Sequence, residues 1–277
     1  MSETLVACCQ LPLTVGETEA NRTACRNAIT AAAGQGAQIV VVPELANSGY
    51  VFEDRAEARR CAESLDGPTV SQWIELARRH DVVIVGGVCE REAGTQALRN
   101  SAVIVDRDGL RAAYRKAHLW DRELEVFEPG DAPPPVLDMP HGRLSVIVCY
   151  DVEFPEWVRL PALNGADLLC VPTNWPRESR PAGERPAEVV RVQAAASVNR
   201  MFVAACDRAG SERGVDWVSG TVIVGPDGFP LAGPVVEDRA VTLLAACRLD
   251  EARRKRVSER NDVLGDRRPE LYGAVAR

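Results

Sequence analysis

The sequence predicts a single α/β domain in which two β-sheets are sandwiched between helices. Short apolar runs rich in β-branched residues alternate with longer segments of helical periodicity along the whole chain, a pattern typical of strand–helix–strand units. The alternation passes through two rounds of β-α-β-β character, and no linker separates them. A chain of 277 residues can form one α/β domain, so we expect a single domain over residues 1–277.

The first round of elements ends with a hairpin. Gly34 and Gly36 close the first helix, and the turn Asp106-Arg107-Asp108-Gly109 separates two strand-like runs, as hairpin turns do. A loop rich in charges and prolines follows at residues 116–140. In this round the sequence predicts strands at 4–11, 37–42, 82–90, 100–106 and 110–115, and helices at 18–33, 56–64 and 70–80.

The second round ends in a polar tail. Here the sequence predicts strands at 144–148, 166–171, 201–206, 218–224 and 240–249, and helices at 156–164 and 187–199. The tail, residues 258–277, has few apolar residues that could join a core. We therefore expect it to dock on a partner, at the interface of a homodimer or a higher homo-oligomer.

Charge and hydropathy exclude several classes of partner. The net charge of −7 argues against nucleic acid or an anionic membrane surface as the main partner. No apolar run approaches the roughly 18 residues that a membrane span needs, and the N-terminal residues do not resemble a signal peptide. We expect a soluble, cytoplasmic protein that acts on a small molecule.

The nine cysteines are scattered and contain no C-x-x-C pair. This spacing predicts neither a zinc site nor a thioredoxin-type motif, and we expect no metal and no cofactor. An odd number of cysteines in a chain of this length fits a reducing compartment.

One cysteine stands at a position that favours chemistry. Residues 144–148 form a buried strand-like run that ends on Cys149, and Pro155 and Glu156 then mark the first turn of a helix. A sharp strand-to-helix turn presents the nucleophile in several hydrolases, and a helix N-terminus favours the thiolate. Alternatively, Cys149 is an ordinary buried cysteine.

Two charged residues follow predicted strands in the same way. Glu44 comes directly after the buried run that ends at Pro43, and Lys116 follows the strand at 110–115. Ligand sites of open α/β sheets gather at the carboxyl ends of strands. A partly desolvated glutamate can take the proton of a thiol, and a lysine can stabilise the oxyanion at an attacked carbonyl. Taken singly, each of the two could instead be an ordinary surface or salt-bridged charge.

Three segments that contain these residues resemble the signature blocks of the nitrilase superfamily of carbon–nitrogen hydrolases. They are VVPELANSGY, YRKAHLW and VIVCYDVEFPE, in the family's order. The resemblance implies an α-β-β-α sandwich that pairs into at least a dimer. It also implies that Glu44 is the general base, Lys116 the oxyanion-stabilising cation and Cys149 the nucleophile.

The family has a second glutamate before an F-x-P-G turn. Glu123, four residues ahead of Phe127, fits this position and would orient the substrate and the hydrolytic water. Glu125 is the neighbouring candidate. Alternatively, Glu123 is a solvated charge on a helical turn.

The residues around Cys149 resemble the amidase and carbamoyl-hydrolase branches of the superfamily. Tyr150-Asp151 replaces the tryptophan and acid that follow the nucleophile in nitrile-cleaving members, and Pro172–Pro176 (PTNWP) resembles amidases. We expect Tyr50, Tyr150, Asn174 and Trp175 to contact substrate, although Trp175 could be interface core and Asn174 a turn cap. The preferred reaction is hydrolysis of a small aliphatic or ω-amino-acid amide through a cysteine thioester. N-carbamoyl amine or amino-acid hydrolysis and nitrile hydrolysis are the alternatives.

Two other hypotheses remain open. His118, two residues after Lys116, could be the base of a cysteine–histidine hydrolase with Asn174 or Asp121 as its partner, but Glu44 would then have no role. The chain could also be a catalytically silent member of the superfamily that is kept for binding or regulation.

Overall fold

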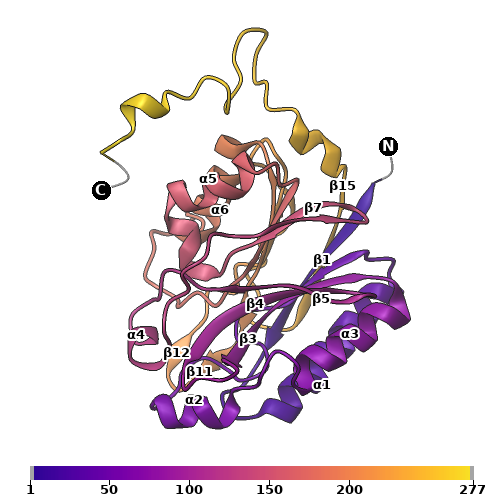
Figure 1. The fold of residues 1–277 in the computed structure, drawn as a ribbon, viewed down its shortest axis with the longest axis vertical. Coiled ribbons are helices and arrows are strands. Elements are labelled where there is room, and N and C mark those ends of the chain that lie inside the picture. The colour runs from indigo at the N-terminus through magenta and orange to yellow at the C-terminus, as the bar shows by residue number, and fades with distance from the viewer. Residues whose placement is uncertain (1–2, 275–277) are drawn as a thin grey trace.

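The computed structural model describes residues 3–274 as two stacked β-sheets with helices on their outer faces (Figure 1). This is the α-β-β-α arrangement expected from the sequence. The larger sheet has the order β10 (Arg208–Ala209), β1 (Thr4–Pro12), β2 (Ile39–Val41), β3 (Val83–Arg91), β4 (Leu98–Asp106) and β5 (Gly109–Arg115), with β15 (Val241–Cys247) paired to β1. The smaller sheet has the order β14 (Pro230–Ala232), β13 (Val222–Val224), β9 (Phe202–Cys206), β8 (Leu168–Pro172), β7 (Gly142–Val146) and β6 (Val136–Met139).

Helices cover the outer face of each sheet. The larger sheet is covered by α1 (Thr18–Gly34) and α3 (Pro68–His80), and the smaller sheet by α5 (Pro155–Leu163) and α6 (Ala187–Asn199). Two short helices, α2 (Arg55–Cys61) and α4 (Glu123–Val126), lie at one end of the sandwich near the hairpin of β11 (Ser211–Glu212) and β12 (Val215–Asp216). Among residues 3–274 no helix combines the length and hydrophobicity that a membrane span requires.

The alternation of side chains explains why the central strands are apolar throughout. In β2, Ile39 and Val41 pack in the core between the sheets, whereas Val40 and its neighbour Val42 pack under α1 and α3. A strand with two buried faces needs apolar residues at every position. Each fully buried aliphatic side chain stabilises the fold by about 1.5–3 kcal/mol.

The differences from the predicted elements have local causes. The predicted strand at 144–148 ends at Val146, because the Val148 amide donates to the Asp151 carboxylate (3.0 Å) instead of to a strand. The predicted strand at 218–224 begins only at Val222, because Ser219 has a left-handed backbone (φ 56°) that no strand can contain. The loop at 116–140 contains α4 and β6, which are too short to give a periodic signal.

The C-terminal tail extends away from the two sheets (Figure 1). It follows the 3₁₀ helix η2 (Leu249–Arg253), contains a second one, η3 (Pro269–Leu271), and has no fully buried residue between 258 and 274. Residues 275–277 of the predicted tail lie outside the described residues. Docking of the tail on a partner stays a prediction.

A glycine in β3 allows close approach of the segment that carries Glu44. A Cβ atom on Gly87 would lie 2.5 Å from both the Glu44 Cα and the Leu45 nitrogen. The Gly87 backbone also donates to the Pro43 carbonyl (3.0 Å). Position 87 therefore has no room for a side chain unless Glu44 moves.

We predict that Gly87→Ala both destabilises the fold and displaces Glu44. Overpacking of this kind costs about 1–3 kcal/mol, so thermal unfolding should shift down by several degrees. Gly34→Ala is the matched control, because a Cβ there meets no atom within 4 Å and alanine favours a helix. Unfolding of Gly87→Ala at the wild-type temperature would contradict the prediction.

Candidate active site

The predicted catalytic residues come from strand ends that meet at one edge of the sandwich. Glu44 follows β2, and Lys116 follows β5. Because β2 and β3 are parallel, and β4 is antiparallel to both β3 and β5, the carboxyl ends of β2 and β5 share an edge. Cys149 follows β7 of the other sheet, and the Glu44 amide reaches across to the Thr173 carbonyl (3.5 Å) after β8.

The Cys149 turn is held by one buried carboxylate. Cys149 has a left-handed backbone (φ 47°) and starts the 3₁₀ helix η1 (Cys149–Glu153). The Asp151 carboxylate accepts hydrogen bonds from the Val148 amide (3.0 Å), the Tyr114 hydroxyl (2.7 Å) and the His118 amide (3.1 Å). Strain at a non-glycine residue of this kind persists only where the surroundings impose it. Three hydrogen bonds to Asp151 thus fix the turn that contains Cys149.

A single ammonium group links two buried carboxylates. The Lys116 Nζ lies 2.8 Å from Glu44 Oε1 and 2.7 Å from Glu123 Oε1, and all three side chains are almost completely buried. Glu123 starts α4, so the short helix places it beside the lysine. Glu125 is mostly exposed and pairs with Arg122 (3.4 Å). Of the two candidates for the second glutamate, Glu123 is therefore the one that contacts Lys116.

Neutral donors fix the two carboxylates. Asn100 Nδ2 donates to Glu44 Oε1 (2.7 Å), and the Tyr50 hydroxyl donates to Glu123 Oε1 (2.6 Å). The Trp120 amide donates to Glu123 Oε2 (3.0 Å). The other oxygen of Glu44, Oε2, is buried and has no hydrogen-bond partner among the described residues. It is the atom of this cluster that is left free to accept a proton.

Burial and charge set the protonation states. Burial raises the pKa of Glu44 to about 7, against the opposing effect of Lys116. Burial, together with Glu44, raises the pKa of Cys149 well above that of a free thiol, although Lys116 opposes this. Burial by itself would lower the pKa of Lys116, but Glu123 and Glu44 outweigh it and hold that pKa well above its usual range. The resting site contains an ammonium, a neutral thiol and a carboxylate that titrates near neutrality.

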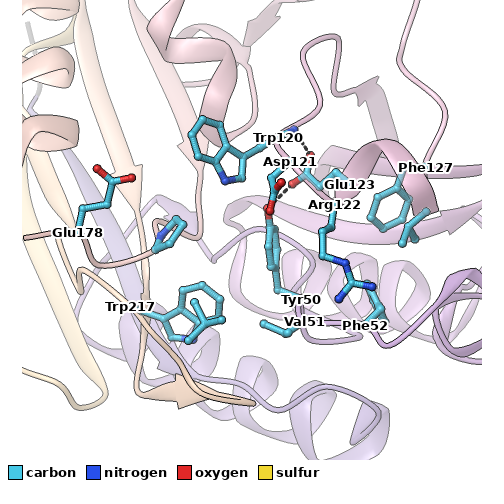
Figure 2. Close-up of a pocket in the computed structure, with 13 residues that line it drawn as sticks. Tyr50, Val51, Phe52, Trp120, Asp121, Arg122, Glu123, Phe127, Glu178 and Trp217 are labelled. Carbon is cyan, nitrogen blue, oxygen red and sulfur yellow. Dashed lines mark hydrogen bonds between the residues drawn. The ribbon is translucent and has the colours of Figure 1, made fainter.

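A cavity of about 280 Å³ opens beside Glu123 (Figure 2). Its walls are mainly aromatic and aliphatic, with a few charged residues. They are Tyr50, Val51, Phe52, Trp120, Asp121, Arg122, Glu123, Val126, Phe127, Pro176, Glu178, Val215 and Trp217. Cys149, Glu44 and Lys116 are buried and are not among these residues, so Glu123 is the member of the cluster that lines the cavity. The cavity can hold a small, largely apolar group beside Glu123, whose carboxylate contacts the Lys116 ammonium (2.7 Å).

The four predicted substrate contacts have different positions. Tyr50 lines the cavity. Tyr150 packs edge-on against Trp120, one of the cavity walls, at 4.8 Å between centroids. Asn174 is buried, and neither polar atom of its side chain has a partner among the described residues. Trp175 belongs to the core between the sheets and is not among the residues that line the cavity.

The alternative based on His118 does not match the geometry. The His118 Nδ1 lies 2.7 Å from Asp151, and its ring stacks on Phe154 at 3.8 Å between centroids. These contacts make His118 a support of the Cys149 turn. Neither Asn174 nor Asp121 orients the imidazole, as that hypothesis required; its partner is Asp151.

Three further residues lie at the site that were not predicted from the sequence. Asn100 binds Glu44, Trp217 lines the cavity, and Arg208 donates to the carbonyls of residues 44 and 45. Asn100 is a polar residue within a predicted strand, and this position could have marked it as a site residue. Trp217 and Arg208 belong to a segment for which the sequence predicted no element.

Known proteins match the chain along most of its length. A family model described as carbon–nitrogen hydrolase matches residues 5–257. A nitrilase from Pyrococcus abyssi is 34% identical over 96% of this chain and 98% of that protein. An (R)-stereoselective amidase from a Pseudomonas species is 35% identical over 93% of this chain and 89% of that protein.

Solved structures also match the chain along most of its length. A crystal structure of an amidase from Nesterenkonia sp. superposes with a TM-score of 0.80 at 30% identity, and covers 98% of this chain and 95% of that one. A variant of the amidase from Nesterenkonia sp. AN1 was solved with acrylamide added to its active-site cysteine. Amidases thus occur among both the sequence relatives and the structural neighbours, which supports the predicted amide-hydrolysing enzyme. The chain belongs to the carbon–nitrogen hydrolase family, within the nitrilase superfamily.

Proposed function

We propose that this enzyme hydrolyses a small amide to the carboxylic acid and ammonia through a thioester on Cys149. The observation that carries the proposal is the arrangement around Lys116. Its ammonium has three N–H donors, and two of them point to Glu44 and Glu123. The third is left for an oxyanion, and the free Oε2 of Glu44 is left for a proton.

The first half of the reaction forms the thioester. Glu44 takes the proton of the Cys149 thiol as the sulfur attacks the amide carbon, and the oxyanion binds Lys116 and the Tyr150 amide. When the carbon–nitrogen bond breaks, the proton passes from Glu44 to the leaving nitrogen, and ammonia departs. One preorganised oxyanion donor typically contributes about 10²–10³ in turnover.

The second half releases the acid. Glu44 takes a proton from water, the hydroxide attacks the thioester carbon, and the carbon–sulfur bond breaks. The sulfur leaves as a thiolate and regains the proton from Glu44, which restores the resting site. Glu123 holds Lys116 in place and lines the cavity, so its second role is to orient the substrate and this water.

The walls of the cavity favour an amide with a hydrocarbon chain or an amino group. Most of the lining residues are apolar, and those with charges include Asp121 and Glu178. Its arginine, Arg122, donates to the Glu53 carbonyl (2.9 Å), and Arg177 donates to the Trp217 carbonyl (3.0 Å). The lining contains three acids, Asp121, Glu123 and Glu178, against the single arginine Arg122, which also pairs with Glu125 (3.4 Å). An aliphatic or ω-amino-acid amide fits better than a dicarboxylic monoamide.

The enzyme is proposed to work as a homodimer or a higher homo-oligomer in the cytoplasm. Apolar side chains are exposed on the outer helices and in the tail, among them Val190, Val198, Leu271 and Tyr272. All nine cysteines are free and buried, which fits a reducing compartment.

We predict that analytical ultracentrifugation of the intact protein gives at least twice the mass of one chain. Removal of residues 258–277 should lower this mass. A monomer for the intact chain would contradict this assignment.

Intact-mass analysis of the acylated enzyme tests the reaction most directly. We predict that incubation with butyramide and with an ω-aminobutyramide releases ammonia and adds one acyl group to Cys149. Cys149→Ala should abolish both signals, whereas Cys247→Ala, at another buried cysteine, should keep both. Ammonia release by Cys149→Ala would contradict the proposal. So would a wild-type enzyme that hydrolyses neither of the two amides.

The pKa of Glu44 predicts an acidic limb in the pH profile. The reaction needs Glu44 ionised and the thiol protonated, so protonation of Glu44 at low pH removes the base. Because burial raises the pKa of Glu44 to about 7, kcat/KM should rise about tenfold per pH unit below pH 7 and then level off. A profile that is flat down to pH 5 would contradict this role.

A further inference from the structure

A second buried ion pair lies outside the groups that the proposed reaction uses. Arg208 in β10 and Glu212 in β11 have 0% and 2% of their side-chain surface exposed. The Arg208 Nη1 lies 3.3 Å from each oxygen of Glu212. A buried guanidinium and carboxylate lose their hydration, and apolar residues of similar volume are often at least as stable in such a place. Stability alone therefore does not account for this pair.

The pair is bonded to both ends of the segment from Glu44 to Val51. At one end, the Arg208 Nη2 donates to the carbonyls of Glu44 (3.5 Å) and Leu45 (3.4 Å). At the other end, Glu212 Oε2 accepts hydrogen bonds from the amides of Tyr50 (2.8 Å) and Val51 (2.6 Å). The segment is an irregular loop whose backbone has no sheet partner of its own at these atoms.

The loop needs such a support because its backbone is strained. Leu45, directly after the general base, has a left-handed backbone (φ 46°). Gly49 is also left-handed, and a Cβ there would lie 2.7 Å from Glu212 Oε1. A non-glycine residue in this region persists only when its surroundings hold it. Arg208 supplies that hold through the carbonyls of the two peptide groups on either side of the Leu45 Cα.

The same pair is in contact with the cavity wall. The Arg208 guanidinium lies 5.8 Å from the Trp217 ring centroid. Trp217 in turn packs edge-on against Tyr50, also at 5.8 Å between centroids, and Tyr50 donates to Glu123 (2.6 Å). Figure 2 shows Trp217 and Tyr50 side by side in the cavity. Both catalytic carboxylates are thus connected to Arg208 and Glu212 through short contacts.

We propose that Arg208 and Glu212 are positioning residues that hold the 44–51 loop so that Glu44 and Tyr50 keep their places in the active site. Neither residue contacts the substrate. The inference rests on the proposed role of Glu44 as the general base.

The opposite charges of the pair give a specific readout. The charged and titratable groups that act on Glu44 are Lys116 from the end of β5, Glu123 from α4, Cys149 from η1, Tyr50 from the loop, and Arg208 from β10. Loss of the positive charge at Arg208 disfavours the Glu44 carboxylate. Loss of the negative charge at Glu212 leaves Arg208 uncompensated and favours that carboxylate.

The test uses Glu212→Gln, Arg208→Lys and Arg208→Met in the full-length enzyme. We expect kcat to fall about 10²-fold in each, because a small displacement of a catalytic group costs this much, with KM changed much less. The acidic limb of kcat/KM should move to lower pH in Glu212→Gln and to higher pH in Arg208→Met. If Arg208→Met fails to fold, the kcat values of Arg208→Lys and Glu212→Gln still test the inference.

Asp167→Asn is the matched control. Asp167 is also a buried acid paired with an arginine, Arg253 (2.9 Å), but it precedes β8, at the opposite end of that strand from Thr173 and the active site. It should lose thermal stability and keep the wild-type kcat and acidic limb. A wild-type kcat in both Glu212→Gln and Arg208→Lys would overturn the inference. So would an acidic limb of kcat/KM that shifts by the same amount in all variants, Asp167→Asn included. A wild-type enzyme without a thioester would instead refute the proposed function.

Discussion

The active site depends on one buried ammonium group that is shared by two buried carboxylates. A buried ion costs several kcal/mol in lost hydration, so neither Lys116 nor Glu44 nor Glu123 could remain charged there alone. Burial favours the neutral form of Glu44, whereas Lys116 favours its carboxylate. The pKa of Glu44 near 7 expresses this balance. A group that exchanges a proton readily with a neighbouring thiol is what thioester chemistry requires.

The fold supplies this cluster by bringing strand ends together. Glu44 and Lys116 follow strands of the larger sheet at the same edge, and Cys149 follows a strand of the smaller sheet opposite them. These three residues are far apart in the sequence, and only the stacking of the two sheets makes them neighbours. Hydrogen bonds from nearby groups then fix their orientation: Asp151 holds the Cys149 turn, and Asn100 binds Glu44.

Much of this arrangement could be predicted from the sequence, for physical reasons. Cys149 and Glu44 each follow an apolar run, and a polar residue at the end of a buried strand gives a strong signal. Lys116 follows a strand that contains Arg111 and Arg115 and is partly exposed, so its assignment depended on the resemblance of its segment to the nitrilase superfamily. The signal fails where local pattern does not determine burial. Trp175 follows β8 by three residues and Trp217 follows β12 directly; both are buried, yet only Trp217 lines the cavity. The strands β10, β11 and β12 contain two residues each, too few for any periodicity, so the sequence did not predict the Arg208–Glu212 pair.

The proposed reaction requires the third N–H of Lys116 and Oε2 of Glu44 to bind opposite ends of one amide group. A crystal structure of the Cys149→Ala variant with butyramide bound would measure this directly. We expect the amide oxygen within hydrogen-bond distance of Lys116 Nζ and the amide nitrogen within hydrogen-bond distance of Glu44 Oε2. An amide bound in the reverse orientation, or one held in the cavity away from both groups, would contradict it.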